Sequence, residues 1–373
     1  MHNYLNNTKN INMKNKNLII FIIFFFIISI LSIYSSTFLI NKSYSNIYIK
    51  QIIWYIISFI LIFFIYKKKR GFFFKYDKLL YIIGNILLIL VLIFGKEING
   101  SKAWFNIFNI SIQPSEFMKI FLIIILATTL SKNNVKNRSF RSEIIVIGKC
   151  TLLTLIPSII TFLEPDTGNI IIYFIILISM LFVYGIRYRW YIISLLLIIG
   201  LIILFFYIYN YKQDTFINIF GTNLFYRIDR LTMWKNNESE QLRNALSATG
   251  STSLTGYGLG KTPIYFPECE TDFIVSIIFS NFGIIFSIIF TIVLLIFDIL
   301  LLKLCLENKK RYKYLLVGIT SIIIYGQVQN LGMNLGLFPI TGITLPFISY
   351  GGSSLMSYMI LIGLVFNTNK KTS

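Results

Sequence analysis

A short acidic stretch directly before a long apolar run is the part of this sequence best suited to acid–base chemistry. The segment Pro267–Phe273 reads PECETDF and carries three carboxylates, those of Glu268, Glu270 and Asp272. Burial disfavours the charged form of a carboxyl group and raises its pKa, and such a group can act as a general base toward a hydroxyl. The same charges would also stabilise a helix N-terminus without any catalytic role. The segment by itself leaves both interpretations open.

Few other side chains in the chain can transfer protons. The only histidine is His2, in a polar tail, which leaves little room for histidine catalysis or histidine metal ligation. Cys150 falls in an apolar run and Cys305 on the expected cytoplasmic side, so the three cysteines predict no disulfide framework. Acid–base work therefore falls on Asp, Glu, Lys or Tyr.

The elements that must position these groups are membrane helices. The chain has 373 residues, 56% of them hydrophobic, and apolar runs of near-spanning length recur along it. We expect an all-α polytopic membrane protein of about ten spans. The net charge of +19 does not indicate a nucleic-acid partner, because the basic residues fall in short loops between spans. The expected spans are residues 17–40, 49–66, 77–95, 115–131, 144–163, 168–186, 190–210, 273–302, 313–332 and 349–367.

The distribution of lysine, arginine and proline predicts the orientation. Most lysines and arginines fall in segments that share a side with the N-terminus, which by the positive-inside rule is the cytoplasmic side. We therefore expect one membrane domain over 1–373, with cytoplasmic tails at 1–16 and 368–373. A large extracytoplasmic loop, 211–272, would lie between the seventh and eighth spans. Every proline except Pro157 falls on the outer side, where irregular backbone requires cover from protein or a water-filled cavity. The chemistry is expected there.

Two further outer segments carry paired charges. In the first, QPSE opens a helix and places Glu116 and Lys119 at i,i+3 on one face. This is either a helix cap with a local ion pair or a polar cluster that faces a cavity, because ionisable groups inside a membrane are costly and often functional. In the second, the turn Glu164–Asn169 holds two carboxylates, but a single turn cannot complete an oxygen-ligand shell for a cation.

Two glycine-containing segments are also notable. Gly256, Gly258 and Gly260 precede Lys261; backbone amides in such turns can cradle phosphate, but no Walker pattern follows, and a flexible polar loop is favoured. The segment Asn330–Ser354 interrupts an apolar run with Gly and Pro turns, which predicts a broken or re-entrant segment.

The order of these motifs resembles the SEDS proteins (shape, elongation, division and sporulation), the membrane peptidoglycan polymerases that include RodA and FtsW. Four segments carry the resemblance: GSKAWFNIFNISIQPSEFMK, EPDTGN, PECETDFI and GLFPITGITLPFISYGGSS. The resemblance implies a glycosyltransferase that polymerises lipid II at the outer face of the bacterial cytoplasmic membrane. GITLPFISYGGSS looks more like RodA, whereas MWK at Met233–Lys235 is the feature closer to FtsW.

The resemblance also implies roles for individual residues. Asp272 matches the family's essential aspartate and is the expected catalytic base. The expected substrate-binding residues are Lys102, Trp104, Glu116, Lys119, Asp166, Arg243, Lys261, Ser349, Gly351, Gly352 and Ser353. The chain departs from the family where Glu270 replaces a histidine, where Ala103 replaces an arginine, and where Ser280-Asn281 replaces a Glu-Glu pair.

The implied reaction is attack by the 4-hydroxyl of a lipid-linked GlcNAc on C1 of a MurNAc that carries undecaprenyl diphosphate. A divalent cation, Mg²⁺ or Mn²⁺, is the expected cofactor, with ligands that the sequence does not identify. The implied partners are lipid II, a class B penicillin-binding transpeptidase and membrane lipids. The expected role is RodA-like elongation of the cell wall and control of shape. The alternatives are an FtsW-like septal polymerase, a lipid II flippase without catalysis, or a scaffold.

Overall fold

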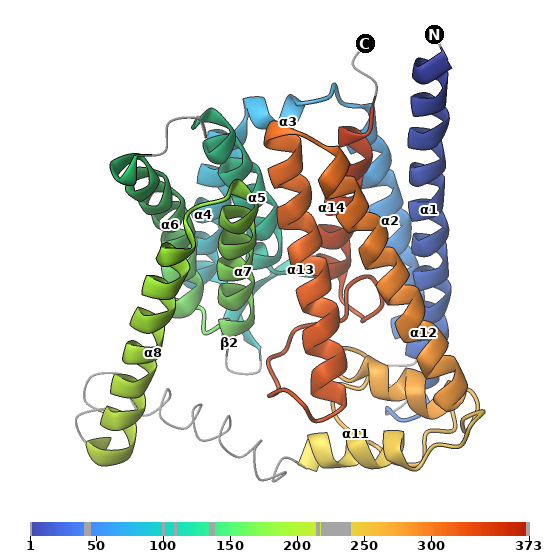
Figure 1. Ribbon diagram of the computed structural model, residues 1–373. Helices are drawn as coiled ribbons and strands as arrows, with labels where there is room; N and C mark the ends of the chain where they lie inside the picture. The colour runs from blue at the N-terminus through green and yellow to red at the C-terminus, as the bar shows by residue number, and fades with distance from the viewer. Residues whose placement is uncertain are drawn as a thin grey trace.

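The computed structural model is a bundle of membrane-length helices with a small extramembrane layer at one end (Figure 1). It describes residues 2–40, 46–98, 101–107, 110–133, 139–213, 217 and 240–370. The helices are α1 (His2–Ser36), α2 (Ile47–Lys67), α3 (Phe72–Lys75), α4 (Asp77–Phe94), α5 (Pro114–Lys132), α6 (Phe140–Leu163), α7 (Thr167–Tyr184), α8 (Tyr188–Tyr211), α11 (Glu240–Gly250), α12 (Ile274–Glu307), α13 (Lys310–Asn334) and α14 (Gly352–Thr368).

A helix occupies each of the ten expected spans, and the all-α polytopic fold class is confirmed. Within the described residues, eight helices are long and apolar enough to cross a membrane. The last span, α14, is a shorter apolar helix of 17 residues, and the expected seventh span is the 24-residue helix α8. Both termini lie at one end of the bundle, and α11 lies at the other end (Figure 1). This is the arrangement that an even number of spans requires.

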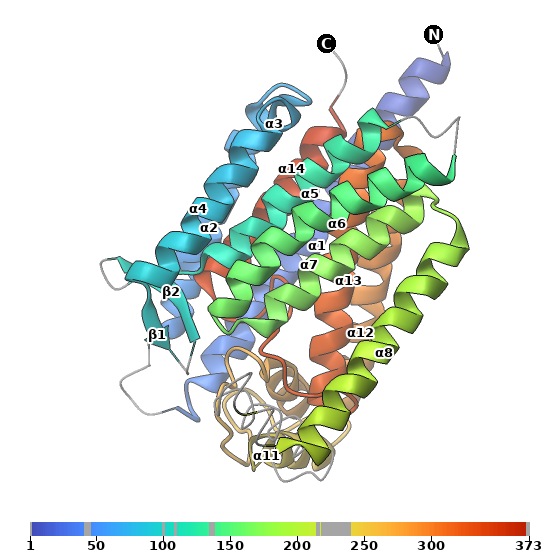
Figure 2. The ribbon, with the colours of Figure 1, turned by 90° about the vertical axis from the view of Figure 1, so that its left-hand side faces the viewer.

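Helix α5 is the centre of the bundle. Its sequence is apolar around nearly its whole circumference, and its side chains are buried along most of its length. It packs against α4, α7, α13 and α14, and Figure 2 shows α5, α6 and α7 side by side. The charged residues near its start, Glu116 and Lys119, are therefore held inside the protein rather than at its surface.

A small antiparallel sheet is a local departure from the expected all-helical pattern. It consists of β1 (Lys96–Ile98), β2 (Ser101–Ile107) and β3 (Ile110–Ile112), with β2 in the middle. Phe105 pairs with Ile112 across β2 and β3. The sheet fills the connection between α4 and α5, and it brings β2 to the outer end of the bundle.

Helix α12 is interrupted at Gly283, whose φ of 82° is left-handed and favours glycine. The loop that follows α11 supplies hydrogen bonds on both sides of the interruption. The amides of Tyr257 and Gly258 donate to the carbonyls of Ser280 and Asn281, each at 3.0 Å. Beyond the break, the amides of residues 284 and 285 donate to the carbonyls of residues 253 and 254 at 3.3 Å. The loop replaces the bonds that the broken helix cannot make itself.

This loop is therefore an ordered part of the fold rather than the flexible polar loop that the sequence favoured. Its glycine amides are used internally: Gly258 donates to Asn281, and Gly260 donates to the hydroxyl of Ser35 at 2.7 Å. These amides are not directed at a phosphate, which excludes the phosphate-cradle interpretation for them.

Candidate active site

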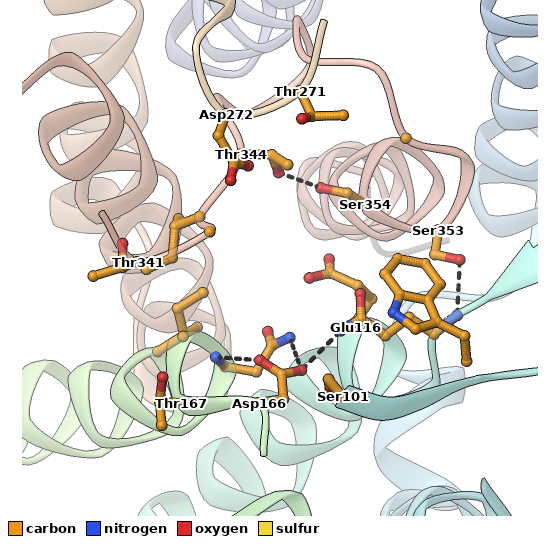
Figure 3. A pocket seen from close by; sticks show the side chains of 18 of the residues that line it. Ser101, Glu116, Asp166, Thr167, Thr271, Asp272, Thr341, Thr344, Ser353 and Ser354 are labelled. Atoms are coloured by element: carbon orange, nitrogen blue, oxygen red, sulfur yellow. Dashed lines mark hydrogen bonds between the residues drawn. The ribbon is translucent and has the colours of Figure 1, made fainter. Parts of the chain in front are cut away.

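A polar cavity of about 340 Å³ lies at the outer end of the bundle. It is formed by segments far apart in the sequence: strand β2, the start of α5, the turn between α6 and α7, the acidic stretch before α12, and the connection from α13 to α14. Asp272 stands on one side of the cavity, and Glu116 and Asp166 stand on the other (Figure 3). Three of the four motifs noted in the sequence supply acidic residues to this single space.

Asp272 is the acidic group best placed to accept a proton. Within the described residues its carboxylate makes no hydrogen bond or ion pair, and it faces the cavity (Figure 3). Burial, together with the nearby charges of Glu268 and Glu270, raises its pKa to about 7. A carboxyl group with this pKa is substantially ionised at neutral pH and is still basic enough to take a proton from a hydroxyl.

Asp166 is held in place by a network of donors from two segments, the start of α5 and the start of α7. One of its carboxylate oxygens accepts from Gln113 Nε2 at 2.7 Å, from Ser115 Oγ at 2.9 Å and from Asn169 Nδ2 at 2.8 Å. The other oxygen accepts from the backbone amide of Asn169 and so caps α7. This carboxylate joins α5 to α7 and shapes the cavity wall.

Glu116 and Lys119 form an ion pair at the edge of the cavity. Lys119 Nζ lies 2.7 Å from Glu116 Oε2, and Ser357 Oγ donates to the same oxygen at 3.0 Å. The ammonium also lies 5.1 Å from the centre of the Tyr358 ring. The arrangement is the cavity-facing cluster rather than a solvated surface pair. Lys119 is the one basic residue among the described residues that line the cavity.

The family model described as "Cell cycle protein", which covers FtsW, RodA and SpoVE, matches residues 15–373. The chain belongs to this family. It is 31% identical to the probable peptidoglycan glycosyltransferase FtsW of Hydrogenovibrio crunogenus, over 80% of this chain and 75% of that protein. It is 35% identical to the stage V sporulation protein E of Bacillus subtilis, over 79% of each chain.

Two solved structures share the fold. One, described as "Structural coordination of polymerization and crosslinking by a peptidoglycan synthase complex", gives a TM-score of 0.77 at 22% identity over 95% of this chain and 96% of that chain. The rod shape-determining protein RodA of Thermus thermophilus gives a TM-score of 0.69 at 24% identity over 95% of each chain.

The SEDS resemblance and the multi-pass location in the bacterial cytoplasmic membrane are confirmed. The preference for RodA over FtsW is not resolved, because curated relatives carry the FtsW and SpoVE names.

The cavity of this FtsW/RodA/SpoVE-family chain contains seven of the twelve residues predicted for the site. Among them, Ser353 accepts from the backbone amide of Gln113 at 3.0 Å and thereby ties α14 to the start of α5. The seven residues are Trp104, Glu116, Lys119, Asp166, Asp272, Gly351 and Ser353.

The structure does not place the other five predicted residues at the cavity. Lys102 Nζ donates to the carbonyl of Ile93, and Arg243 and Lys261 are exposed elsewhere on the outer face. Gly352 serves helix packing, since a Cβ there would lie 2.4 Å from the ring of Trp54. Ser349 turns away from the cavity and donates to the carbonyl of Thr271. Sequence proximity to a motif does not fix whether a residue lies at the cavity, and the substrate-binding role of these five residues stays a prediction.

Sequence reasoning missed several hydroxyl groups of the cavity. Thr341 and Thr344 come from the coil after α13, and Thr344 Oγ1 lies 2.8 Å from Ser354 Oγ (Figure 3). The signal for them was present in PITGITLPFISY, where threonines flank a glycine in an otherwise apolar run. Ser101 of β2 was missed because the sheet was not predicted.

Glu164 is a second unexpected feature near the cavity. Its side chain is fully buried, and within the described residues neither carboxylate oxygen has a hydrogen-bond partner. Burial, together with the charge of Asp166, raises its pKa to about 8. The group is therefore mostly protonated at neutral pH. It was interpreted from the sequence only as one of two charges in a turn.

Among the described residues, no group of three His, Cys, Asp or Glu side chains comes together. Asp166 already accepts several hydrogen bonds, and Glu116 is neutralised by Lys119. Mg²⁺ is commonly held by one or two carboxylates together with phosphate oxygens and water.

Proposed function

We propose that this chain is a peptidoglycan glycosyltransferase that polymerises lipid II into β-1,4 glycan strands at the outer face of the cytoplasmic membrane. Two lines of support are the curated FtsW relatives and the polar cavity at one end of the membrane bundle. The observation that carries the proposal is the Asp272 carboxyl, which has no partner among the described residues, whose pKa is raised to about 7 and which faces that cavity. A lipid carrier would hold the sugar diphosphates at this depth.

In the proposed reaction, Asp272 takes the proton from the 4-hydroxyl of the lipid-linked GlcNAc. The hydroxyl oxygen forms a bond to C1 of MurNAc while the bond from C1 to the diphosphate oxygen breaks on the opposite face. An α-linked donor thus gives a β-linked product by inversion. The diphosphate leaves with the bonding electron pair and needs charge neutralisation rather than a proton. The proton remains on Asp272 until the product has moved.

Charge neutralisation falls to Lys119 and to a divalent cation that arrives with the diphosphate. Lys119 is the only basic side chain among the described residues at the cavity, and its own charge is shared with Glu116. A cation such as Mg²⁺ or Mn²⁺ bound to the phosphates would supply the remaining positive charge. Asp166 and Ser353 belong to rigid networks and would shape the sugar site.

We propose a RodA-like role in cell-wall elongation, supported by the motif GITLPFISYGGSS. A septal role is the second candidate, because the chain is 31% identical to a protein named FtsW. Depletion separates the two: loss of an elongation enzyme rounds and widens cells, whereas loss of a septal enzyme gives filaments. The proposed partner is a class B penicillin-binding transpeptidase, supported by the fold match to a protein of a peptidoglycan synthase complex.

The test is glycan polymerisation by the purified full-length protein with lipid II. Asp272→Asn keeps the shape of the side chain and removes the base, so the rate should fall by about 10²–10⁴-fold, the usual contribution of general-base catalysis. Asp77→Asn is the matched control, because Asp77 lies at the start of α4, outside the set of cavity-lining residues, and is equally an aspartate with little exposure. It should polymerise like the wild type.

A flippase would behave differently in the same experiment. It would move lipid II across vesicle membranes without lengthening glycan strands. The wild type would then show no polymerisation, so Asp272→Asn could not lower its rate. Long strands made by Asp272→Asn at the wild-type rate would remove the proposed role of this carboxylate.

A further inference from the structure

Two buried asparagines of α13 hold the backbone of Asp272. Asn330 Nδ2 donates to the carbonyl oxygen of Asp272 at 2.9 Å, and Asn334 Nδ2 donates to the same oxygen at 3.0 Å. Asn330 is 0% exposed and Asn334 is 1% exposed. A carbonyl that accepts two amide hydrogen bonds in a buried setting is fixed firmly, because breaking either bond leaves a polar group without water to replace it.

Asn334 also fixes the point at which α12 begins. Its Oδ1 atom accepts from the backbone amide of Ser276 at 3.0 Å and from the Ser276 hydroxyl at 2.8 Å. Phe273, the residue that precedes α12, provides no side-chain cap, and the first amides of a helix lack partners within it. The side-chain amide of Asn334 therefore bridges Asp272, two residues before the helix, and the first turn of the helix. Asp272 cannot shift along the α12 axis without breaking this bridge.

The two residues before Asp272 are held from another direction. Ser349 Oγ donates to the carbonyl of Thr271 at 2.6 Å, and the amide of Tyr350 donates to the carbonyl of Glu270 at 2.9 Å. Three consecutive carbonyls are thus bonded to α13 and to the coil before α14. Asn330 connects these two supports as well, because its Nδ2 also donates to the carbonyl of Ile343 at 2.9 Å.

We infer that Asn330 and Asn334 are positioning residues that set the place of the Asp272 carboxyl in the cavity. The inference rests on the proposed function of Asp272. Neither asparagine is among the residues that line the cavity, so both act through Asp272 rather than on the substrate. Reactions that depend on an aligned base are sensitive to displacement, and about 1 Å can cost on the order of 10²-fold in rate.

The experiment measures kcat, KM for lipid II and the pH–rate profile of full-length Asn334→Ala and Asn330→Ala, each per folded molecule. We expect kcat to fall by about 10–100-fold with KM nearly unchanged. The acid limb of the profile should move to lower pH, because a carboxyl released toward water loses part of the burial that raises its pKa. If the two asparagines served stability alone, their replacement would change neither kcat per folded molecule nor the pH of the acid limb.

Asn367→Ala is the matched control. Asn367 is 4% exposed, and its Nδ2 donates to the carbonyls of Ile65 and Lys68, which lie at the opposite end of the membrane helices from Asp272. This variant should lose stability as the other two do but keep the wild-type kcat and acid limb. Asn330→Ala leaves the Asn334 bond in place and is the milder variant if Asn334→Ala does not fold.

The outcomes separate this inference from the proposed function. A folded Asn334→Ala or Asn330→Ala enzyme with wild-type kcat and an unmoved limb, beside an inactive Asp272→Asn enzyme, overturns the positioning role and leaves the function standing. An Asp272→Asn enzyme with wild-type rate overturns both.

Discussion

Lys119 Nζ lies 2.7 Å from Glu116 Oε2, one turn earlier on α5, and the lysine side chain is only 1% exposed. An ion pair in this position is stable as a pair, but each charge is costly alone. The motif was visible in the sequence, because the i,i+3 spacing places both side chains on one helix face. Its burial was one of two alternatives, and the packing of neighbouring helices around α5 decides between them.

Lys119→Met should destabilise the protein, because it leaves the Glu116 carboxylate buried without a partner. The expected loss in free energy of unfolding is about 3–5 kcal/mol. The double variant Glu116→Gln/Lys119→Met should recover part of it, as measured by thermal unfolding in detergent. Lys69→Met, at an exposed lysine just after α2, is the control and should change little. Wild-type stability and activity in Lys119→Met would show that the pair is not coupled.

Polymerisation should depend on pH through Asp272. The pKa of this carboxyl is raised to about 7 and the base must be ionised, so kcat/KM should rise with pH through about 7 and then level off. Glu268→Gln removes a negative neighbour that raises this pKa, so the limb should move to lower pH while most of the rate remains. An acid limb with its midpoint near pH 4 would contradict the assignment of Asp272 as the base. A limb that Glu268→Gln does not shift would contradict it as well.

Glu164 should make the stability of the protein fall as pH rises. The folded protein holds its proton with a pKa of about 8, above the ordinary value of 4.5, so the native state binds more protons over this window. Stability contributed by the protonated group is present below the unfolded pKa and is lost as pH passes through the folded pKa. Wild type should therefore lose more thermal stability than Glu164→Gln between pH 5 and pH 9.

Asp272 acts in the same direction at slightly lower pH, so the quantity to compare is the difference between wild type and Glu164→Gln at each pH. A difference that stays constant from pH 5 to pH 9 would show that Glu164 titrates normally.

Gly283→Ala should weaken the fold at the break in α12. Its φ of 82° is unfavourable for alanine, and an added Cβ would lie 2.3 Å from the amide nitrogen of Gly256. A residue forced into such a conformation costs on the order of 1–3 kcal/mol, and the clash adds to this. Gly148→Ala in α6 is the control, since nothing lies within 4 Å of its Cβ position. That change should leave the unfolding temperature unchanged or slightly higher.

The sequence predicted the features that depend on local pattern. The ten spans follow from runs of apolar residues, and Asp166 and Glu116 stood out because charges beside membrane segments are rare and costly. The site could be predicted to this extent because four motifs each contain a polar residue that no helix could hide in lipid. Their convergence on one cavity is a property of the bundle.

The features that sequence reasoning missed depend on contacts between distant segments. Nothing in the apolar run around Gly283 distinguishes it from an ordinary helix, because the break is stabilised by the loop of residues 251–260. Arg243 and Lys261 were predicted to bind substrate, whereas the structure places both exposed side chains outside the cavity. Asn330 and Asn334 were interpreted as part of a broken segment, yet both lie in the last turns of α13.

The break at Gly283 divides α12 into a part that is long enough to span the hydrocarbon alone and a part that is not needed for the span. Residues 284–307 alone extend about 36 Å at 1.5 Å per residue, more than the hydrocarbon thickness of about 30 Å. The part before the break is bonded to the outer loop and is not needed to cross the membrane. The span of α12 is thus complete without residues 274–282, and Asp272 is placed by its bonds to α13 rather than by the length that the membrane demands of α12.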